Sequence, residues 1–317
     1  MLEDLQDPRD VLLSNIDITK TRVEFSVEPI VLLFGGFVNL PKAKPDDLDP
    51  PVTSLRDAIH RSNPSYEIFR PEEITSWQAD SVFNNLMEFE SDLTSICTLV
   101  VIILESAGSL VELGAFSQLQ DLKKKIIVVR SSDFKDDISF INHGILRYIS
   151  EGHESSVKSY PWNIDKPELI TDEIVKDVIF DIQEELSKLK KTEVVKLNKS
   201  SHVIVLICEI VSYFKAVKET EILNYLQLID VKLSKGELKS KLFLLEHFQL
   251  INKEEYSDSV FYIRSNNDYH RLRLSFKDGA YPDVLRIQTE CLAFYSEDNK
   301  HRNRIRVIKQ AERGGRL

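Results

Sequence analysis

Three runs of almost uninterrupted apolar residues constrain the fold more than any other feature of this chain. They are PIVLLF at 29–34, TLVVIIL at 98–104 and KIIVVR at 125–130. A strand that is apolar throughout is buried on both faces of its sheet, as in parallel sheets covered by helices. A shorter strand at 66–69 and helices from about Thr53, at 77–95 and at 110–123 complete an alternating pattern. The sequence therefore predicts a Rossmann-like α/β domain with a parallel sheet.

The loops that follow these strands carry the residues suited to chemistry. Open parallel sheets bind ligands beyond the carboxyl ends of their strands. The first of these loops contains Gly35-Gly36, the next runs from Glu105 to Glu112, and the last contains Asn142-His143-Gly144. We therefore expect the site at this edge of the sheet.

The segment after the third apolar strand has two interpretations. Ser106, Gly108 and Ser109 stand where a helix begins, and free amides and hydroxyls at a helix N-terminus suit a phosphate. Glycine lets the backbone approach a ligand closely. On this interpretation, Glu112 lies in the first helical turn beside the pocket. Alternatively, Ser109 and Glu112 have the S-x-x-E spacing of a capping box, which is purely structural.

The pattern changes after a charged helix at 171–191 and a polar stretch at 190–201. We expect a first domain at 1–195 and a second at 196–317. The second begins with three predicted helices and two short predicted strands, at 201–216, 219–228, 234–248, 250–253 and 260–263. Three helices followed by a β-ribbon is the order of a winged helix.

The net charge is −10, but basic residues gather in two places in the second half of the chain. The third helix of the predicted winged helix carries Lys235, Lys239 and Lys241, and the C-terminal stretch includes Arg302, Arg304 and Arg306. These six are the candidate nucleic-acid contacts. Winged helices that bind only protein, and a solvated, disordered C-terminus, are the alternatives.

Several classes of protein are disfavoured. No apolar run reaches the ~18–20 residues of a membrane span, and the acidic first residues do not resemble a secretory signal. Cys97, Cys208 and Cys291 are far apart, which argues against a disulfide framework and a zinc site. We expect a cytoplasmic protein with no metal, cofactor or membrane contact.

The motifs resemble those of a known group of proteins. The run ESAGSLVELGAFS at 105–117 is similar to the signature of the nucleoside 2-deoxyribosyltransferase-like superfamily. It resembles more closely the effectors of retron anti-phage systems, which carry a similar run and then a segment like SFINHG at 139–144. FGG at 34–36 and IFRPE at 68–72 match as well. Those effectors also end in a smaller winged-helix-like domain, so the resemblance covers about 30–148 by motif and the rest by architecture.

The resemblance implies cleavage of an N-glycosidic bond, and it implies roles for individual residues. Glu112 matches the carboxylate that attacks or stabilises the anomeric carbon. Ser106 and Ser109 fall where relatives bind a 5′-phosphate. Glu90 is the candidate acid for the departing base, with Glu88 as its rival. The further substrate contacts expected are Gly35, Gly36, Glu105, Gly108 and Asn142, although Asn142 also suits a loop-fixing role.

One position departs from the family pattern. Many members have an aspartate where the third strand begins, and this chain has Thr98. That absence leaves open a second hypothesis, in which the α/β domain senses a nucleotide without breaking it and the winged helix regulates DNA.

The resemblance also implies partners. It suggests a toxin that acts on NAD or a purine deoxynucleotide and is restrained by a reverse transcriptase and its multicopy DNA-RNA hybrid. A homo-oligomer is expected, because relatives often complete the pocket with a neighbouring subunit.

Overall fold

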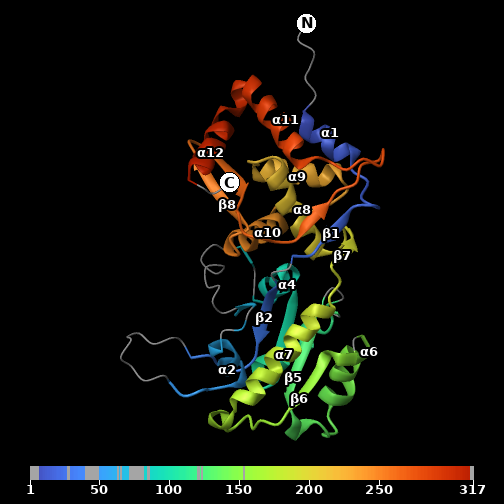
Figure 1. The fold of residues 1–317 in the computed structure, drawn as a ribbon, viewed down its shortest axis with the longest axis vertical. Coiled ribbons are helices and arrows are strands. Elements are labelled where there is room, and N and C mark those ends of the chain that lie inside the picture. The colour runs from blue at the N-terminus through green and yellow to red at the C-terminus, as the bar shows by residue number, and fades with distance from the viewer. Residues whose placement is uncertain are drawn as a thin grey trace. The chain divides into compact units, whose positions relative to one another are not determined.

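The computed structural model describes residues 7–26, 29–39, 50–62, 64, 66–70, 82–83, 86–119, 122, 124–152 and 154–314. The chain divides into two compact units (Figure 1). The α/β unit comprises Glu28–Thr75 and Leu93–Leu189. The helix-rich unit comprises Met1–Val27, Ser76–Asp92 and Lys190–Leu317.

The α/β unit is built on a parallel sheet of five strands. These are β2 (Ile30–Phe34), β3 (Glu67–Phe69), β4 (Leu99–Ile103), β5 (Ile126–Ser131) and β6 (Val157–Tyr160). All neighbouring strands in the sheet run parallel, which confirms the predicted architecture. Strands β2 and β4 are buried at every position, as their continuous apolar sequences require. The sequence did not reveal β6, because VKSY at the sheet edge is polar and mostly half-buried.

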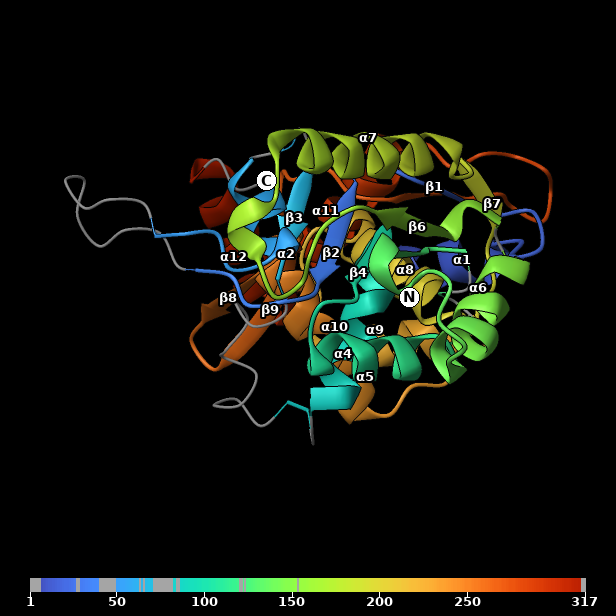
Figure 2. The ribbon, with the colours of Figure 1, turned by 90° about the horizontal axis from the view of Figure 1, so that it is seen from below.

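Helices cover both faces of this sheet. On one face, α2 (Leu55–Arg61) and α7 (Asp172–Lys188) pack on side chains that include Val31 and Leu33. On the other face lies α5 (Ala107–Phe116), whose Phe116 ring meets Phe34 edge-on at 5.1 Å. Figure 2 shows α7 and α5 on opposite sides of the strands. The structure begins α5 three residues earlier than the sequence suggested and ends it well before Lys123.

The strand order β3-β2-β4-β5-β6 locates a topological switch point. From β2, the chain passes to β3 on one side and then returns to β4 on the other. At such a point neighbouring loops leave in opposite directions and open a crevice at the carboxyl ends of the strands. The crevice expected here lies between the loops that follow β2 and β4.

The helix-rich unit contains the helices and hairpin expected from the sequence. They are α8 (Ser200–Tyr213), α9 (Glu219–Leu228), α10 (Lys235–His247), β8 (Ile251–Tyr256) and β9 (Ser259–Arg264). Strands β8 and β9 form an antiparallel hairpin. The order of elements therefore agrees with the sequence, and the assignment of this group as a winged helix stays a prediction. Residues 82–92, which include most of α4 (Leu86–Ile96), group with this unit, where the Phe83 ring contacts Phe243 on α10.

A small antiparallel sheet brings the start of the chain into the helix-rich unit. Strand β1 (Arg22–Glu24) pairs with both β7 (Thr192–Val194) and β10 (Arg271–Arg273). The boundary expected near 195 lies close to the observed division at Lys190, but the first 27 residues group with the C-terminal part. Three-residue strands pair by tertiary contact, so local sequence gave no sign of this arrangement.

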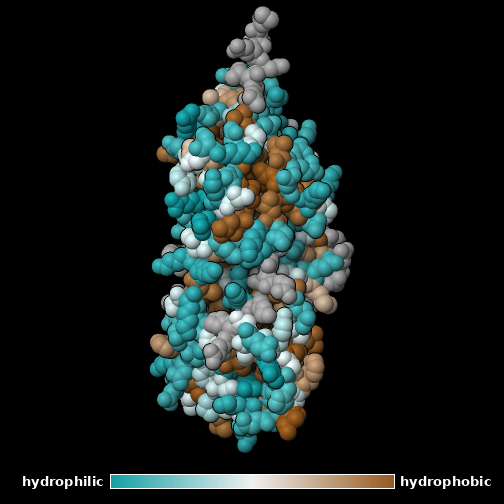
Figure 3. Space-filling model, turned by 90° about the vertical axis from the view of Figure 1, so that its right-hand side faces the viewer, coloured by the Kyte–Doolittle hydropathy of each residue, from teal (hydrophilic) through white to brown (hydrophobic). Residues whose placement is uncertain are grey.

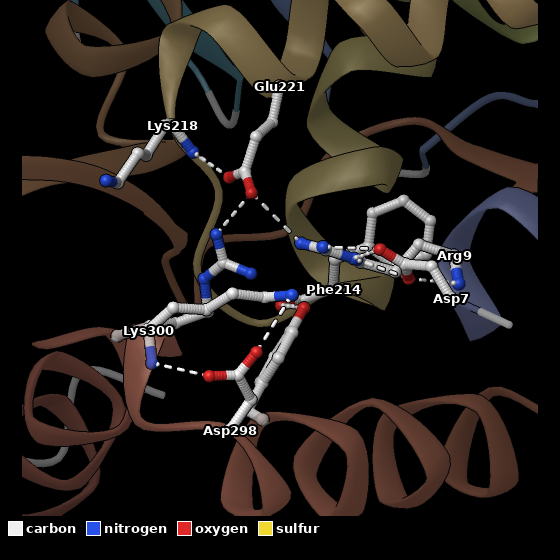
Figure 4. Close-up of polar contacts among 9 residues, drawn as sticks. Asp7, Arg9, Phe214, Lys218, Glu221, Asp298 and Lys300 are labelled. Atoms are coloured by element: carbon white, nitrogen blue, oxygen red, sulfur yellow. Dashed lines mark hydrogen bonds and ion pairs between the residues drawn. The ribbon is translucent and has the colours of Figure 1, made fainter. Parts of the chain in front are cut away.

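The basic C-terminal stretch forms α12 (Arg302–Arg313), which follows α11 (Val284–Glu297). This corrects the alternative of a disordered end for residues 302–313. Buried charges tie α12 to the rest of the unit (Figure 4). Glu221 on α9 accepts hydrogen bonds from Arg304 on α12 and from Arg9 on α1 (Pro8–Asn15), the latter at 3.1 Å.

The face drawn in Figure 3 is mostly hydrophilic. On the face in Figure 3, hydrophobic residues gather at the height where Figure 1 shows α9 and α11. The large exposed apolar side chains of the helix-rich unit include Leu228 and Leu285. Among the residues that the structure describes, no helix combines the length and apolar character needed to span a bilayer.

Candidate active site

Three of the predicted site residues, Gly35, Gly36 and Glu105, lie at the carboxyl ends of two neighbouring strands. Gly35-Gly36 directly follow β2, and Glu105 lies just beyond β4, its neighbour in the sheet. Paired residues Phe34 and Ile102 lie near the ends of these strands, so both loops leave the same edge at the switch point.

Glu105 is tied to backbone rather than exposed to solvent. Its Oε1 accepts hydrogen bonds from the Gly36 amide at 2.9 Å and the Arg56 amide at 3.0 Å, and its Oε2 accepts one from the Leu55 amide at 2.8 Å. Leu55 and Arg56 are the first residues of α2, whose amides have no partner within the helix. Burial raises the pKa of the Glu105 carboxyl, although these three amides and Arg56 favour its charged form.

Protein atoms fill the space beside the two glycines. A Cβ on Gly36 would stand 2.6 Å from the Ser54 Cβ and 3.1 Å from the Glu105 Cδ. A Cβ on Gly35 would meet the Glu105 Oε1 at 2.9 Å. Gly35 and Gly36 were predicted to contact substrate, and the structure gives a packing reason for a glycine at both positions. Direct contact of Gly35 or Gly36 with substrate stays a prediction.

The N-terminus of α5 is capped in a way the sequence did not indicate. Ser106 is the N-cap, and it forms a capping box with Ser109, whose amide donates to the Ser106 Oγ at 3.1 Å. The alternative in which Ser109 and Glu112 form the box is therefore wrong. Ser109 is fully buried, and its hydroxyl donates to the Ser106 carbonyl at 2.9 Å. Ser106 also donates to the Gly35 carbonyl at 3.0 Å, which joins the loops after β2 and β4.

Glu112 lies in the second turn of α5, since the helix starts at Ala107 and its first turn has no acidic residue. This corrects the expected first-turn position. Its side chain is half-buried, and the cap does not use it. Gly108 in the first turn is exposed, and a Cβ there would meet only the Ser106 Oγ at 3.7 Å. Unlike Gly35 and Gly36, Gly108 is not required by packing, and its role in admitting substrate stays a prediction.

Asn142 fixes a loop. Its Oδ1 accepts from Arg130 at 2.6 Å, and its Nδ2 donates to the carbonyls of Phe134 and Asp137, both at 2.8 Å. It belongs to a π-helical turn, Ile141–Leu146, of a kind common at functional sites. Of its two expected roles, the structure provides the loop-fixing one, and contact with substrate stays a prediction. His143 in the same turn is exposed.

Thr98 lies at the amino ends of the strands, whereas the candidate site lies at their carboxyl ends. It precedes β4, and its Oγ1 accepts from the Ile30 amide at 3.1 Å, where β2 begins. An acid at this position would stand at the amino ends of the strands, a full strand length from Glu105. Its absence therefore takes no side chain away from the loops at the carboxyl ends, where the site is predicted.

The candidate acids Glu90 and Glu88 lie on α4, within the stretch that groups with the helix-rich unit. Glu90 is half-buried and Glu88 is exposed. The choice of Glu90 as the acid for the leaving base stays a prediction.

The six basic candidates of the helix-rich unit fall into two classes. Lys235, Lys239 and Arg302 are exposed. The others have partners within the protein: Lys241 donates to Ser200 at 2.7 Å and pairs with Asp92 at 3.5 Å, Arg304 pairs with Glu221, and Arg306 donates to the Tyr256 hydroxyl. Lys241 and Arg304 are also buried, so contact with phosphates stays a prediction for the exposed three alone.

Sequence reasoning missed the contribution of α2. Ser54 caps this helix, and the Arg56 Nη1 donates to the Gly36 carbonyl at 3.3 Å. A serine at the start of an apolar helical pattern was the available signal for the cap. No local pattern indicated that the amides of this helix receive Glu105.

Comparison with known proteins agrees with these motifs. Residues 52–253 match the family model described as "STM3845 retron effector protein". Over 81 residues, 26% of each chain, the sequence is 37% identical to the "Retron Ec73 putative ribosyltransferase/DNA-binding protein" of Escherichia coli. Over 92 residues it is 34% identical to the "Retron Ec86 putative ribosyltransferase/DNA-binding protein" of the same organism, covering 29% of this chain and 30% of that one. The chain thus aligns with less than a third of the length of either relative.

Proposed function

This chain belongs to the STM3845 retron effector family, and on that basis we propose that its α/β unit cleaves the N-glycosidic bond of a nucleotide, with Glu112 acting on the sugar. The observation that carries the proposal is the placement of Glu112. It is a half-buried carboxylate, not used in capping, on the helix that starts beyond β4 at the switch point of the sheet. The name ribosyltransferase given to two relatives agrees with chemistry at the anomeric carbon.

The chemistry needs a carboxylate at this place. As the bond from C1′ to the base nitrogen breaks, its electron pair leaves with the base and the sugar acquires oxocarbenium character. A carboxylate beside C1′ stabilises that cation or forms an ester with it. Water then bonds to C1′, which breaks the ester bond where one has formed, and the proton that water loses passes to the solvent. We assign this role to Glu112. A purine leaves more readily when protonated, and Glu90 is our candidate acid; nicotinamide leaves NAD as a neutral base and needs no acid.

We propose NAD or a purine deoxynucleotide as the substrate. Depletion of either would poison a cell, which is the outcome expected of a toxin in an anti-phage system. The proposed restraint is a complex with the retron reverse transcriptase and its multicopy DNA-RNA hybrid. The helix-rich unit offers exposed Lys235, Lys239 and Arg302 for the nucleic acid, and the relatives also carry the name DNA-binding protein.

The test is release of free base. Purified protein is incubated with NAD and, separately, with each deoxynucleoside triphosphate, and products are separated by chromatography. We expect base release by the wild type and loss of at least about 100-fold in Glu112→Gln, since the amide keeps the shape of the carboxylate without its charge. Glu173→Gln on α7, an exposed first-turn acid, is the matched control and should retain full activity.

The assay is repeated with the reverse transcriptase and its DNA-RNA hybrid present. Full activity in Glu112→Gln would remove Glu112 from its proposed role. If wild-type protein binds the nucleotide but leaves it intact under both conditions, the enzyme hypothesis is refuted in favour of the nucleotide sensor.

A further inference from the structure

The hydrogen bonds of Glu105 indicate a role other than the substrate contact predicted for it from the sequence. Both of its carboxylate oxygens receive backbone amides: Gly36 and Arg56 donate to one, and Leu55 donates to the other, all within 3.0 Å. A carboxylate that accepts three backbone N–H groups is held by charge-assisted hydrogen bonds, which are stronger than neutral ones. Its geometry is that of a clamp between segments.

The segments that Glu105 joins are the ones that form the site. Gly36 belongs to the loop after β2, Leu55 and Arg56 begin α2, and Glu105 itself follows β4 and leads into α5. A second contact, from the Ser106 Oγ to the Gly35 carbonyl at 3.0 Å, crosses the same boundary. The Glu105 side chain packs so closely on Gly35 and Gly36 that a Cβ at Gly35 would stand 2.9 Å from its Oε1 and a Cβ at Gly36 3.1 Å from its Cδ.

From these contacts we propose that Glu105 is a positioning residue, which fixes α5 and hence Glu112 relative to the loop after β2 and does not itself contact substrate. The value of such a clamp is preorganisation. A carboxylate acts on C1′ only from a narrow range of positions, and a displacement of about 1 Å at a reacting group can cost on the order of 100-fold in rate. The part of the inference that concerns catalysis rests on the proposed function, whereas the clamp itself does not.

The first experiment measures the clamp directly in ligand-free protein. Amide hydrogen exchange is followed by mass spectrometry in peptides that contain Gly36 and the Leu55–Arg56 pair. In Glu105→Gln one carboxylate oxygen is replaced by an NH2 group, which cannot accept a hydrogen bond from the backbone amide that faces it. The rate of amide exchange in both peptides should therefore rise roughly 10-fold or more. Glu112→Gln and Glu173→Gln should leave both peptides unchanged. Unchanged exchange in Glu105→Gln would overturn the proposal.

The second experiment separates positioning from substrate contact. The loss of kcat/KM in Glu105→Gln is compared for NAD and for its analogue with a 2′-deoxyribose on the nicotinamide side. If Glu105 is a positioning residue, Glu105→Gln lowers kcat/KM by the same factor, roughly 10–100-fold, for NAD and for the analogue, and the loss is mainly in kcat. A factor that shrinks for the deoxy analogue would show a hydrogen bond to the sugar and overturn the proposal. If Glu112→Gln stays active, the proposed function fails, and the exchange experiment still decides whether Glu105 is the clamp.

Discussion

The strongest stability prediction concerns Glu221, which neutralises buried charge in the helix-rich unit (Figure 4). The side chains of its two arginine partners, Arg9 and Arg304, are 6% and 3% exposed, and that of Glu221 is 21% exposed. Arg9 has a second carboxylate partner in Asp7, at 2.6 Å. Within the residues that the structure describes, Glu221 is the one carboxylate ion-paired with Arg304.

The change Glu221→Gln preserves shape and removes the charge. Arg304 then remains buried without a counter-ion, although the Tyr295 ring lies 4.6 Å from its guanidinium carbon. Removing one partner of a buried ion pair costs about 3–5 kcal/mol, and Gln keeps one acceptor, so we expect about 3 kcal/mol. For a unit of this size that corresponds to a fall in melting temperature of roughly 6–12 °C.

Calorimetry of the intact chain measures the transition of the helix-rich unit. Glu290→Gln is the control, since Glu290 pairs with Arg286 on the exposed face of α11 and should give no measurable shift. The double variant Glu221→Gln/Arg304→Met should recover part of the loss, because the orphaned charge is gone. A loss below about 1 kcal/mol for Glu221→Gln would refute the reasoning that desolvated charge dominates here.

The same residue predicts an acid response. Its arginine partners hold the pKa of the Glu221 carboxyl below the ordinary value of 4.5, despite partial burial, and Arg9 likewise lowers the pKa of Asp7. A lowered folded-state pKa adds stability that is present above the ordinary pKa and is lost as the pH falls below it. The wild-type helix-rich unit should therefore lose stability below about pH 4.5, and Glu221→Gln should lose less over that interval. Parallel curves would contradict this assignment.

Three further predictions follow from particular contacts. Gly36→Ala should destabilise the α/β unit by about 1–3 kcal/mol, because the new Cβ clashes with Ser54. Gly114→Ala on α5 should stabilise the same unit by about 0.5–1 kcal/mol, because a Cβ there meets nothing within 4 Å. Urea unfolding measures both changes, and equal effects of the two variants would contradict the packing argument. Lys235→Ala and Lys239→Ala should each reduce the salt dependence of nucleic-acid binding by about one unit of slope without lowering stability, as measured by fluorescence anisotropy across a salt series. Lys241→Ala should lower stability instead, since Lys241 is buried against Asp92 and Ser200; unchanged thermal unfolding would speak against that pairing.

Much of the architecture was readable from the sequence because its signals are local. The apolar runs at 29–34, 98–104 and 125–130 predicted central strands, and the structure has β2, β4 and β5 there. A strand buried on both faces needs an apolar residue at every position, and few other secondary-structure elements have that requirement. The three helices and hairpin of the helix-rich unit were found for a similar reason, since helical periodicity and turn residues lie within short windows.

The tertiary structure decided how the site is assembled. The spacing of Ser109 and Glu112 fits a capping box, yet the helix starts at Ala107, and the capping box is formed by Ser106 and Ser109. Glu105 was predicted to contact substrate, and that contact stays a prediction; what the sequence could not indicate is that the Gly36 and Leu55 amides, 69 and 50 residues away in the chain, donate to its carboxylate. Likewise Lys241 and Arg304 looked like surface cations until folding brought Asp92 and Glu221 to them. Sequence patterns report the periodicity and turns of nearby residues, whereas the partner of a polar group is set by the packing of distant segments, which no short window contains.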